Sequence, residues 1–104
     1  MFVVELRQTE TFAKWLSGLR DRQARVRIQI RLDRLQLGLA GDAKPVGSGV
    51  WELRVDYGPG YRVYFIRRQT DLIILLAGGD KRTQSQDIRI AIELAENLPE
   101  RKKA

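Results

Sequence analysis

The chain has 104 residues, of which 43% are hydrophobic, and this is enough for one hydrophobic core. It contains no cysteine and no histidine, which excludes disulfides, thiol nucleophiles, imidazole catalysis and the usual zinc ligands. The net charge is +6, from 19 Lys and Arg against 13 Asp and Glu. Most of these cations are arginines, whose planar guanidinium groups suit phosphate recognition. Composition alone leaves two alternatives open, a basic protein with solvated cations and a nucleic-acid-binding protein.

No apolar run approaches the roughly 18 residues of a membrane span. The N-terminal segment MFVVELRQTE has no basic region ahead of an apolar stretch and no cleavage site, so it does not resemble a signal peptide. We therefore expect a cytoplasmic protein with no membrane partner, folded as a single domain over residues 1–104.

The N-terminal residues predict a strand followed by a short helix. Residues 2–6 (FVVEL) are apolar and partly β-branched, which is typical of a strand. Thr9 can cap the helix that follows. The apolar residues of that helix fall on one face: Phe12, Trp15, Leu16 and Leu19.

The segment after Asp21 is ambiguous, because Val26, Ile28, Ile30 and Leu32 alternate as they would in a strand. We predict a helix, since the segment is longer than a usual strand and has no glycine or proline before Gly38. Two apolar stripes then result, one formed by Ala24, Ile28, Leu32, Leu35 and Leu39, and the other by Val26, Ile30 and Leu37. Either the helix lies between the first helix and the sheet, or the second stripe binds a partner protein.

Residues 38–49 (GLAGDAKPVGSG) predict a loop, because they carry four glycines and a proline. A β-hairpin follows, with its reversal at residues 57–61 (YGPGY). The alternation of apolar residues predicts a register in which Val55 faces Val63, Leu53 faces Phe65 and Arg54 faces Tyr64.

The remaining residues predict one more strand and a final helix. Residues 72–77 (LIILLA) are apolar at every position, as in a strand covered on both faces. Gly78 and Gly79 are expected to follow the end of this strand. Thr83 and Gln86 have capping-box spacing ahead of a helical apolar stripe that stops before Pro99. The fold class is therefore α+β, with a mostly antiparallel sheet of about four strands, an N-terminal helical hairpin and a C-terminal helix.

The polar face of the hairpin carries the candidate catalytic residues Arg54, Arg62 and Tyr64, and Lys81 arrives from the end of the next strand. Further candidates for contact with RNA phosphates are Lys44, Arg67 and Arg82. Each of these side chains also has an ordinary explanation as a surface ion pair or a solvated residue. As a group they are suited to a phosphate, and Gly78 and Gly79 leave room for a ligand to approach the backbone.

Such a group can cleave RNA without histidine or metal. Attack of a ribose 2′-OH on its own phosphate needs a base, an acid and stabilisation of charge at phosphorus. Neighbouring arginines disfavour the protonated form of a lysine, which makes Lys81 the candidate for proton transfer, with Tyr64 as a second. Arg54 and Arg62 are then the transition-state stabilisers. The roles of base and acid stay unassigned.

Two segments, GDAKPVGSGVWELRVDYGPGYRVYF and LLAGGDKRTQSQDI, resemble the RelE/ParE superfamily of type II toxin-antitoxin toxins. Within it the chain is similar to the HigB-like, phage-derived Gp49-like branch of addiction module killer proteins, over residues 12–95. The resemblance implies a RelE-like fold and a ribosome-dependent mRNA endoribonuclease that needs no cofactor. It also implies neutralisation by an antitoxin that has a helix-turn-helix domain and mediates any contact with operator DNA. Arg54, Arg62 and Lys81 match the basic set of this branch, and Tyr64 fits it less closely.

Two other functions stay open beside the mRNA interferase. A gyrase-poisoning toxin of the ParE type would act by binding alone. A degenerate toxin would act only as a co-repressor together with its antitoxin.

Overall fold

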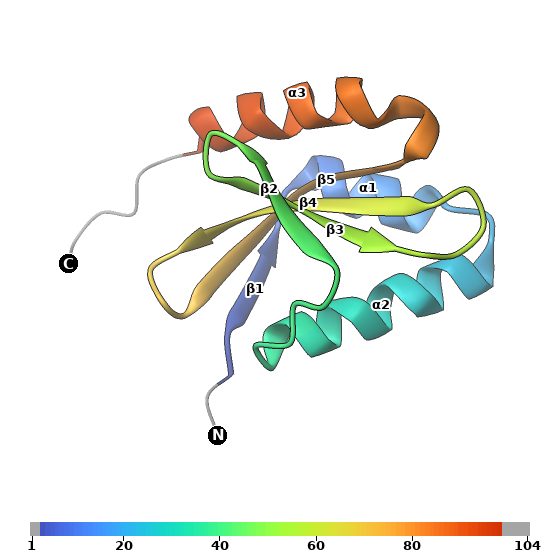
Figure 1. Ribbon diagram of the computed structural model, residues 1–104, viewed down its shortest axis with the longest axis horizontal. Coiled ribbons are helices and arrows are strands. Elements are labelled where there is room, and N and C mark those ends of the chain that lie inside the picture. The colour runs from blue at the N-terminus through green and yellow to red at the C-terminus, as the bar shows by residue number, and fades with distance from the viewer. Residues whose placement is uncertain (1–2, 99–104) are drawn as a thin grey trace.

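The computed structural model, in which residues 3–98 are described, places helices on both faces of a five-stranded sheet (Figure 1). In chain order the elements are β1 (Glu5–Gln8), α1 (Glu10–Gly18), α2 (Arg22–Gln36), β2 (Ala43–Gly47), β3 (Val50–Val55), β4 (Tyr61–Arg68), β5 (Leu72–Asp80), the 3₁₀ turn η1 (Lys81–Thr83) and α3 (Gln84–Glu96). The strand order is β1-β5-β4-β3-β2. Among residues 3–98 only the β1–β5 pair is parallel, so the predicted α+β class and the mostly antiparallel sheet are confirmed.

The sheet has one strand more than predicted, because part of the predicted loop at residues 38–49 forms β2. This strand pairs with β3 at the edge of the sheet, where Pro45 opposes Trp51. Proline is tolerated on an edge strand, since no neighbour there needs its missing N–H. The first strand also starts later than predicted, at Glu5, and Phe2 lies outside the described residues.

The two N-terminal helices form as predicted. The Thr9 side chain accepts a hydrogen bond from the Phe12 N–H, and the Asp21 carboxylate accepts two from the start of α2. Of the two stripes on α2, the one with Ile28 is buried. Val26 and Ile30 on the other stripe are 48% and 45% exposed, so the first of the two predicted alternatives, in which α2 lies between the first helix and the sheet, is wrong.

Two hydrophobic clusters lie on opposite faces of the sheet. The first packs α1 and α2 against one face and includes Phe12, Ile28 and Phe65. The second packs α3 against the other face around Leu76 and Ala91. Strand β5 contributes Leu75 to the first and Leu76 to the second, which confirms that it is covered on both faces. Figure 1 shows the resulting order of α3, sheet and α2.

The register of the β3–β4 hairpin differs from the predicted one by two residues. Val55 faces Tyr61, Leu53 faces Val63 and Arg54 faces Arg62. The connection is therefore longer than predicted, and it is closed by a 3.0 Å hydrogen bond from the Gly60 N–H to the Tyr57 carbonyl. A shift of two residues keeps every side chain on its predicted face, and for that reason the apolar pattern does not detect it.

Gly78 and Gly79 lie inside β5 and do not leave room for a ligand, contrary to the prediction. A Cβ on Gly78 would come within 2.2 Å of the Trp15 ring, and one on Gly79 within 1.8 Å of the Asp87 carboxylate. Both glycines therefore allow close packing within the protein. The Asp87 carboxylate accepts a hydrogen bond from Thr83, and burial raises its pKa.

Gly78→Ala is expected to destabilise the protein by about 1–3 kcal/mol, because the Trp15 ring must move. Urea denaturation followed by circular dichroism measures this change in the free energy of unfolding. Gly18→Ala is the matched control, since a Cβ at Gly18 would meet no atom within 4 Å and alanine favours a helix by about 0.5–1 kcal/mol. Equal stabilities for the two variants would contradict the packing described here.

Candidate active site

A pocket of about 290 Å³ opens where the β3–β4 hairpin meets η1. We name it the basic pocket, and its walls are formed by Asp42, Arg54, Val55, Asp56, Gly60, Tyr61, Arg62 and Lys81. Three of the four candidate catalytic residues, Arg54, Arg62 and Lys81, are thus brought together. Two carboxylates share the wall with these three cations, so the charge of the pocket is partly balanced.

Gly60 lies in the wall of the basic pocket, next to Arg62 and Lys81. Its φ of +84° suits glycine, and a Cβ there would lie 3.7 Å from Arg62 Nη1 and 3.8 Å from Lys81 Cβ. The Arg62 guanidinium also donates to the Gly60 carbonyl at 3.2 Å. Because Tyr61 faces Asp80 in the β4–β5 ladder, Lys81 follows directly at the end of β5 beside this turn.

Arg54 and Arg62 face each other across β3 and β4, an arrangement that places two positive charges side by side. Like charges in this position destabilise a sheet unless other groups compensate them. Each arginine has its own carboxylate: Arg54 Nε lies 3.1 Å from Asp42 Oδ2, and Arg62 Nε lies 3.5 Å from Glu52 Oε2. Lys81 is exposed, and within residues 3–98 it forms no ion pair. Its ammonium group is therefore available to a ligand in the pocket.

Glu52 is a fully buried carboxylate beside the pocket, and sequence reasoning assigned it no functional role. Its Oε2 atom accepts hydrogen bonds from the Tyr64 hydroxyl at 3.1 Å and from Gln84 Nε2 at 2.8 Å. The Lys44 ammonium lies 4.0 Å from Oε1. The sequence does show a charged residue between apolar neighbours in a strand, but this pattern equally suits an exposed residue.

Tyr64 is fully buried, and the structure does not bring it into the basic pocket. It faces Glu52 in the β3–β4 ladder and lies under α3. Burial, and then the charge of Glu52 and the hydrogen bond to it, raise the pKa of the Tyr64 hydroxyl far above its ordinary value. A hydroxyl held in this way does not meet a ligand in the pocket.

Tyr64 gives the protein an expected alkaline instability. The unfolded chain loses the phenol proton near its ordinary pKa of 10.0, whereas the folded protein keeps the proton to higher pH. The folded state then binds more protons, so the free energy of unfolding falls as pH rises above 10.0. Urea denaturation at a series of alkaline pH values measures this fall, and Tyr64→Phe is expected to flatten it. The same slope in both proteins would contradict the assignment.

The tyrosine that does line the pocket is Tyr61, which the sequence analysis placed in the reversal of the hairpin and not among the candidate site residues. It belongs to that core, but its position at the start of β4 also places it at the pocket wall. Burial is the main cause that raises the pKa of its hydroxyl, and Asp21 adds to the effect. At neutral pH Tyr61 therefore presents a neutral phenol.

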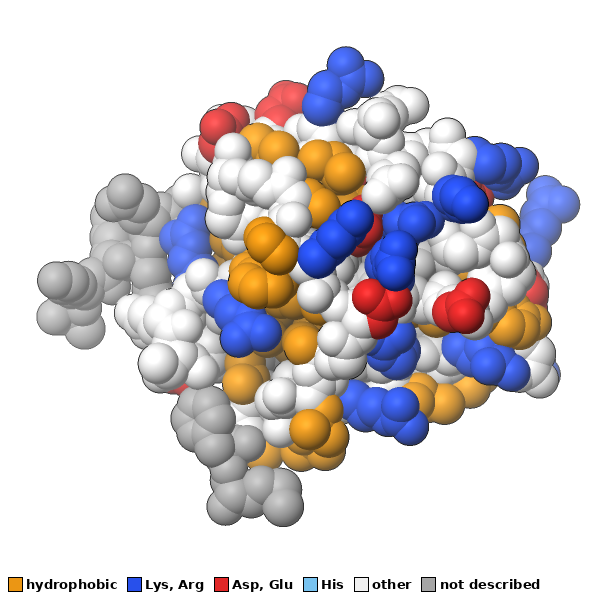
Figure 2. All heavy atoms as spheres, in the orientation of Figure 1, with side chains coloured by type: hydrophobic (Ala, Val, Ile, Leu, Met, Phe, Trp, Pro, Cys, Tyr) orange, Lys and Arg blue, Asp and Glu red, His pale blue; other side chains and the backbone are white. Residues whose placement is uncertain are grey.

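The three candidate phosphate contacts lie at separate places outside the basic pocket. Lys44 is on β2, beside Glu52. Arg82 is paired with Asp80 at 3.0 Å, and this hydrogen-bonded contact lowers the pKa of the Asp80 carboxyl. Arg67 is at the far end of β4, where its guanidinium lies 5.4 Å from the centre of the Trp51 ring. Lys and Arg side chains outnumber carboxylates on the face of the molecule seen in Figure 2.

Among residues 3–98 no group of three or more His, Cys, Asp or Glu side chains is placed to hold a metal ion. No helix within those residues combines the length and the apolar character that a membrane span requires.

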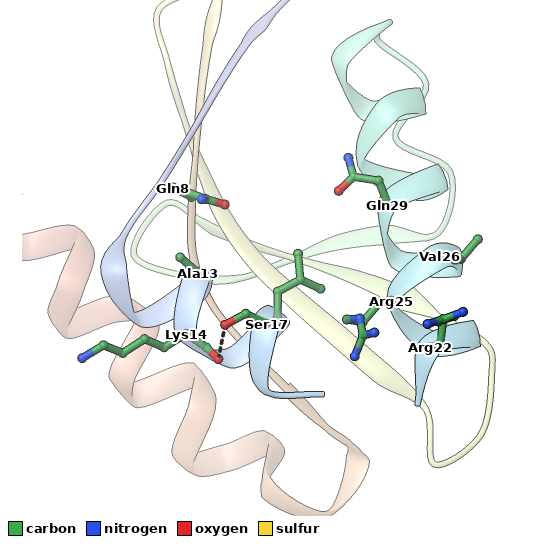
Figure 3. Close-up of a pocket in the computed structure, with 9 residues that line it drawn as sticks. Gln8, Ala13, Lys14, Ser17, Arg22, Arg25, Val26 and Gln29 are labelled. Atoms are coloured by element: carbon green, nitrogen blue, oxygen red, sulfur yellow. Dashed lines mark hydrogen bonds between the residues drawn. The ribbon is translucent and has the colours of Figure 1, made fainter. Parts of the chain in front are cut away.

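A second concave surface lies between α1 and α2, with a volume of about 650 Å³ (Figure 3). We name it the helical groove, and it is lined by Gln8, Ala13, Lys14, Leu16, Ser17, Arg22, Arg25, Val26 and Gln29. Its lining combines apolar side chains with three cations and includes no carboxylate. The groove is therefore suited to an amphipathic, acidic segment rather than to a small anion.

Comparison with known proteins agrees with this architecture. The family of phage derived Gp49-like proteins matches residues 14–99. An uncharacterized protein of Haemophilus influenzae is 47% identical over 95 residues, which cover 91% of this chain and 96% of that protein. The structure of a mutant of the E. coli toxin RelE in the free state superimposes with a TM-score of 0.65 at 15% sequence identity, covering 86% of this chain and 97% of that one. The chain therefore belongs to the phage derived Gp49-like family and has a RelE-like fold.

Proposed function

We propose that the protein is the toxin of a type II toxin-antitoxin system and that it acts as an endoribonuclease on mRNA bound to the ribosome. The observation that carries the proposal is the meeting of Arg54, Arg62 and Lys81 around one open pocket. The Gp49-like family and the RelE-like fold support the proposal. The chain has no histidine, so basic side chains take the place of imidazole in the proposed chemistry.

The proposed reaction is attack of a ribose 2′-OH on the adjacent phosphorus, with departure of the 5′-oxygen of the next nucleotide. Arg54 and Arg62 stabilise the negative charge that builds up on the phosphate oxygens, since fixed cations in a partly closed site need no reorganisation during the reaction. Lys81 is the group for proton transfer, because it is exposed and unpaired beside them. The reaction forms a 2′,3′-cyclic phosphate and a free 5′-hydroxyl, and it requires no cofactor.

The buried position of Tyr64 changes its role in this scheme. Its hydroxyl donates to Glu52 inside the protein, so we assign it to the support of the pocket and not to proton transfer. Tyr61 takes its place as the phenol nearest the reacting groups. Lys44 and Arg82 remain proposed contacts for flanking phosphates, whereas Arg67 lies too far along β4 to share one phosphate with the pocket.

Cleavage of a defined mRNA by the purified protein, with and without translating ribosomes, tests the proposal. We expect cuts with 2′,3′-cyclic phosphate ends in the presence of ribosomes, and their loss with Lys81→Ala. Intact mRNA under both conditions would overturn the proposal. Trapped gyrase cleavage complexes without RNA cuts would point to a ParE-like toxin, and no growth arrest on expression would point to a co-repressor.

The partner of the toxin is proposed to be an antitoxin that carries a helix-turn-helix domain and mediates contact with operator DNA. We place its neutralising segment in the helical groove, because the exposed apolar residue Val26 lines this groove together with the cations Arg22 and Arg25. An acidic amphipathic helix matches both features of this surface.

The double variant Arg22→Glu, Arg25→Glu tests this placement. Reversal of both charges is expected to weaken binding of the antitoxin by about tenfold or more, since like charges then face each other. Isothermal titration calorimetry with the product of an adjacent helix-turn-helix gene measures the change. The double variant Arg67→Glu, Arg89→Glu is the control for net charge, since it reverses two exposed arginines outside the groove. An equal loss of affinity in both proteins would contradict binding in the groove.

A further inference from the structure

A buried carboxylate, Glu52, lies next to Arg62 of the basic pocket and is placed to hold its guanidinium group. Glu52 is fully buried in β3, and Arg62 in β4 is only 8% exposed. Arg62 Nε lies 3.5 Å from Glu52 Oε2, while Nη1 donates to the Gly60 carbonyl at the pocket wall. The Nε edge of the guanidinium therefore faces the protein, and its other end lies at the pocket.

The carboxylate is itself held from three sides. Tyr64 on β4 and Gln84 at the start of α3 both donate to Oε2, and Lys44 on β2 lies 4.0 Å from Oε1. Glu52 thus joins a central strand, an edge strand and a helix around one charge. A carboxylate fixed in this way does not move with Arg62. The position of the carboxylate therefore sets the orientation of the Arg62 guanidinium.

Stability alone does not account for this ion pair. Taking two charges out of water is unfavourable, and an apolar pair of similar volume is often equally stable or more stable. Two atoms of the pair, Glu52 Oε1 and Arg62 Nε, are buried without a hydrogen bond. The burial of these two atoms costs free energy that no hydrogen bond offsets. A functional benefit explains this cost if the ion pair orients Arg62 toward the pocket.

We propose that Glu52 is a positioning residue, which holds the Arg62 guanidinium in the orientation that receives a phosphate in the basic pocket. This inference rests on the proposed function for its catalytic consequence, but the orientation of Arg62 is a property of the protein alone. Tyr64 and Gln84 support the same carboxylate. Glu52 acts on substrate only through Arg62.

The variant Glu52→Gln keeps the shape of the side chain and removes its charge. The new amide side chain still accepts one hydrogen bond, but it no longer attracts the guanidinium, so Arg62 is expected to turn away. Tyr64→Phe is the matched control, since it removes one donor to Oε2 and leaves the ion pair intact. Both variants change a fully buried residue of the same network, so both report any general loss of packing.

Two measurements on these proteins test the proposal. In the NMR spectrum of the Arg side chains, the Arg62 Nε–H is expected to exchange with water about tenfold more slowly than that of Arg89, which lies exposed on α3. Addition of inorganic phosphate is expected to shift the Arg62 signals. Glu52→Gln is expected to abolish both features, whereas Tyr64→Phe is expected to weaken them far less, because the Arg62–Glu52 ion pair remains. An Arg62 signal that is unchanged in Glu52→Gln, or unprotected in the wild-type protein, overturns the proposal.

Cleavage of ribosome-bound mRNA supplies the second measurement. Glu52→Gln is expected to lower the rate at saturating ribosome concentration by about 100-fold, the cost of misplacing one catalytic group. The double variant Glu52→Gln, Arg62→Ala is expected to be no slower than Arg62→Ala, whereas independent effects would multiply. Multiplying effects overturn the proposal. If the wild-type protein does not cleave mRNA, the proposed function fails and the NMR measurement still decides the orientation. If Glu52→Gln does not fold, the wild-type exchange rate decides it.

Discussion

Replacing Lys81 or Arg62 by alanine is expected to lower the rate of mRNA cleavage by about 100-fold or more in each case. Arg62 is the buried cation of the basic pocket, and loss of its charge removes stabilisation of the phosphate where water is least able to replace it. Lys81 supplies the exposed ammonium group for proton transfer. Quench-flow cleavage of a ribosome-bound mRNA measures both rates.

Arg67→Ala is the matched control for charge, because Arg67 lies on the same strand as Arg62 but at its other end. We expect its cleavage rate to stay within about twofold of the wild-type rate at moderate salt, since one distant surface cation contributes little there. Lys81→Arg separates charge from proton transfer, because arginine keeps the charge but does not release its proton in proteins. Equal rates for the Lys81→Ala, Arg62→Ala and Arg67→Ala variants would rule out the basic pocket as the site of cleavage.

Most of the helices and strands follow from local patterns and are predicted from the sequence, but the predicted cap at Thr83 does not form, because its hydroxyl donates to Asp87 and makes no cap hydrogen bond. The caps at Thr9 and Asp21 depend on side chains next to the helix ends, and both form. The short edge strand β2 depends instead on a neighbour. The proline and glycines around Pro45 predict a loop, and the segment forms a strand only because it pairs with β3 in the folded protein. The hairpin register likewise depends on the length of the turn, since shifts by two residues preserve the apolar pattern.

The same shift explains where the structure places the predicted site residues. Arg54 and Arg62 are on the predicted face. The observed register brings them directly opposite each other, whereas the predicted register places Arg54 opposite Tyr64, two residues along the strand from Arg62. It also places Tyr64 beside Glu52, under α3, where a phenol is buried. The sequence identifies the stripe that α3 buries, but it does not say which face of the sheet receives it. The burial of Tyr64 and Glu52 therefore required the tertiary structure.

Ile28→Ala is expected to destabilise the protein by about 2–5 kcal/mol, whereas Ile30→Ala is expected to change its stability by less than about 0.5 kcal/mol. The two residues have the same side chain and lie two positions apart in α2, but Ile28 is fully buried and Ile30 is 45% exposed. Truncation of Ile28 removes apolar contacts with the sheet and leaves a cavity, while the surface around Ile30 is already open to water. Urea denaturation followed by circular dichroism measures the difference.

This pair of variants decides between the two patterns that the sequence of α2 contains. In a strand, Val26, Ile28, Ile30 and Leu32 would share one face, so truncation of Ile28 and Ile30 would cost similar amounts. In a helix, these two residues lie on different faces, and only one of them meets the core. A difference below about 1 kcal/mol would contradict the helix phase. A large difference means that Ile30 has no role in stability, and its exposed side chain is then available to a partner on this side of α2.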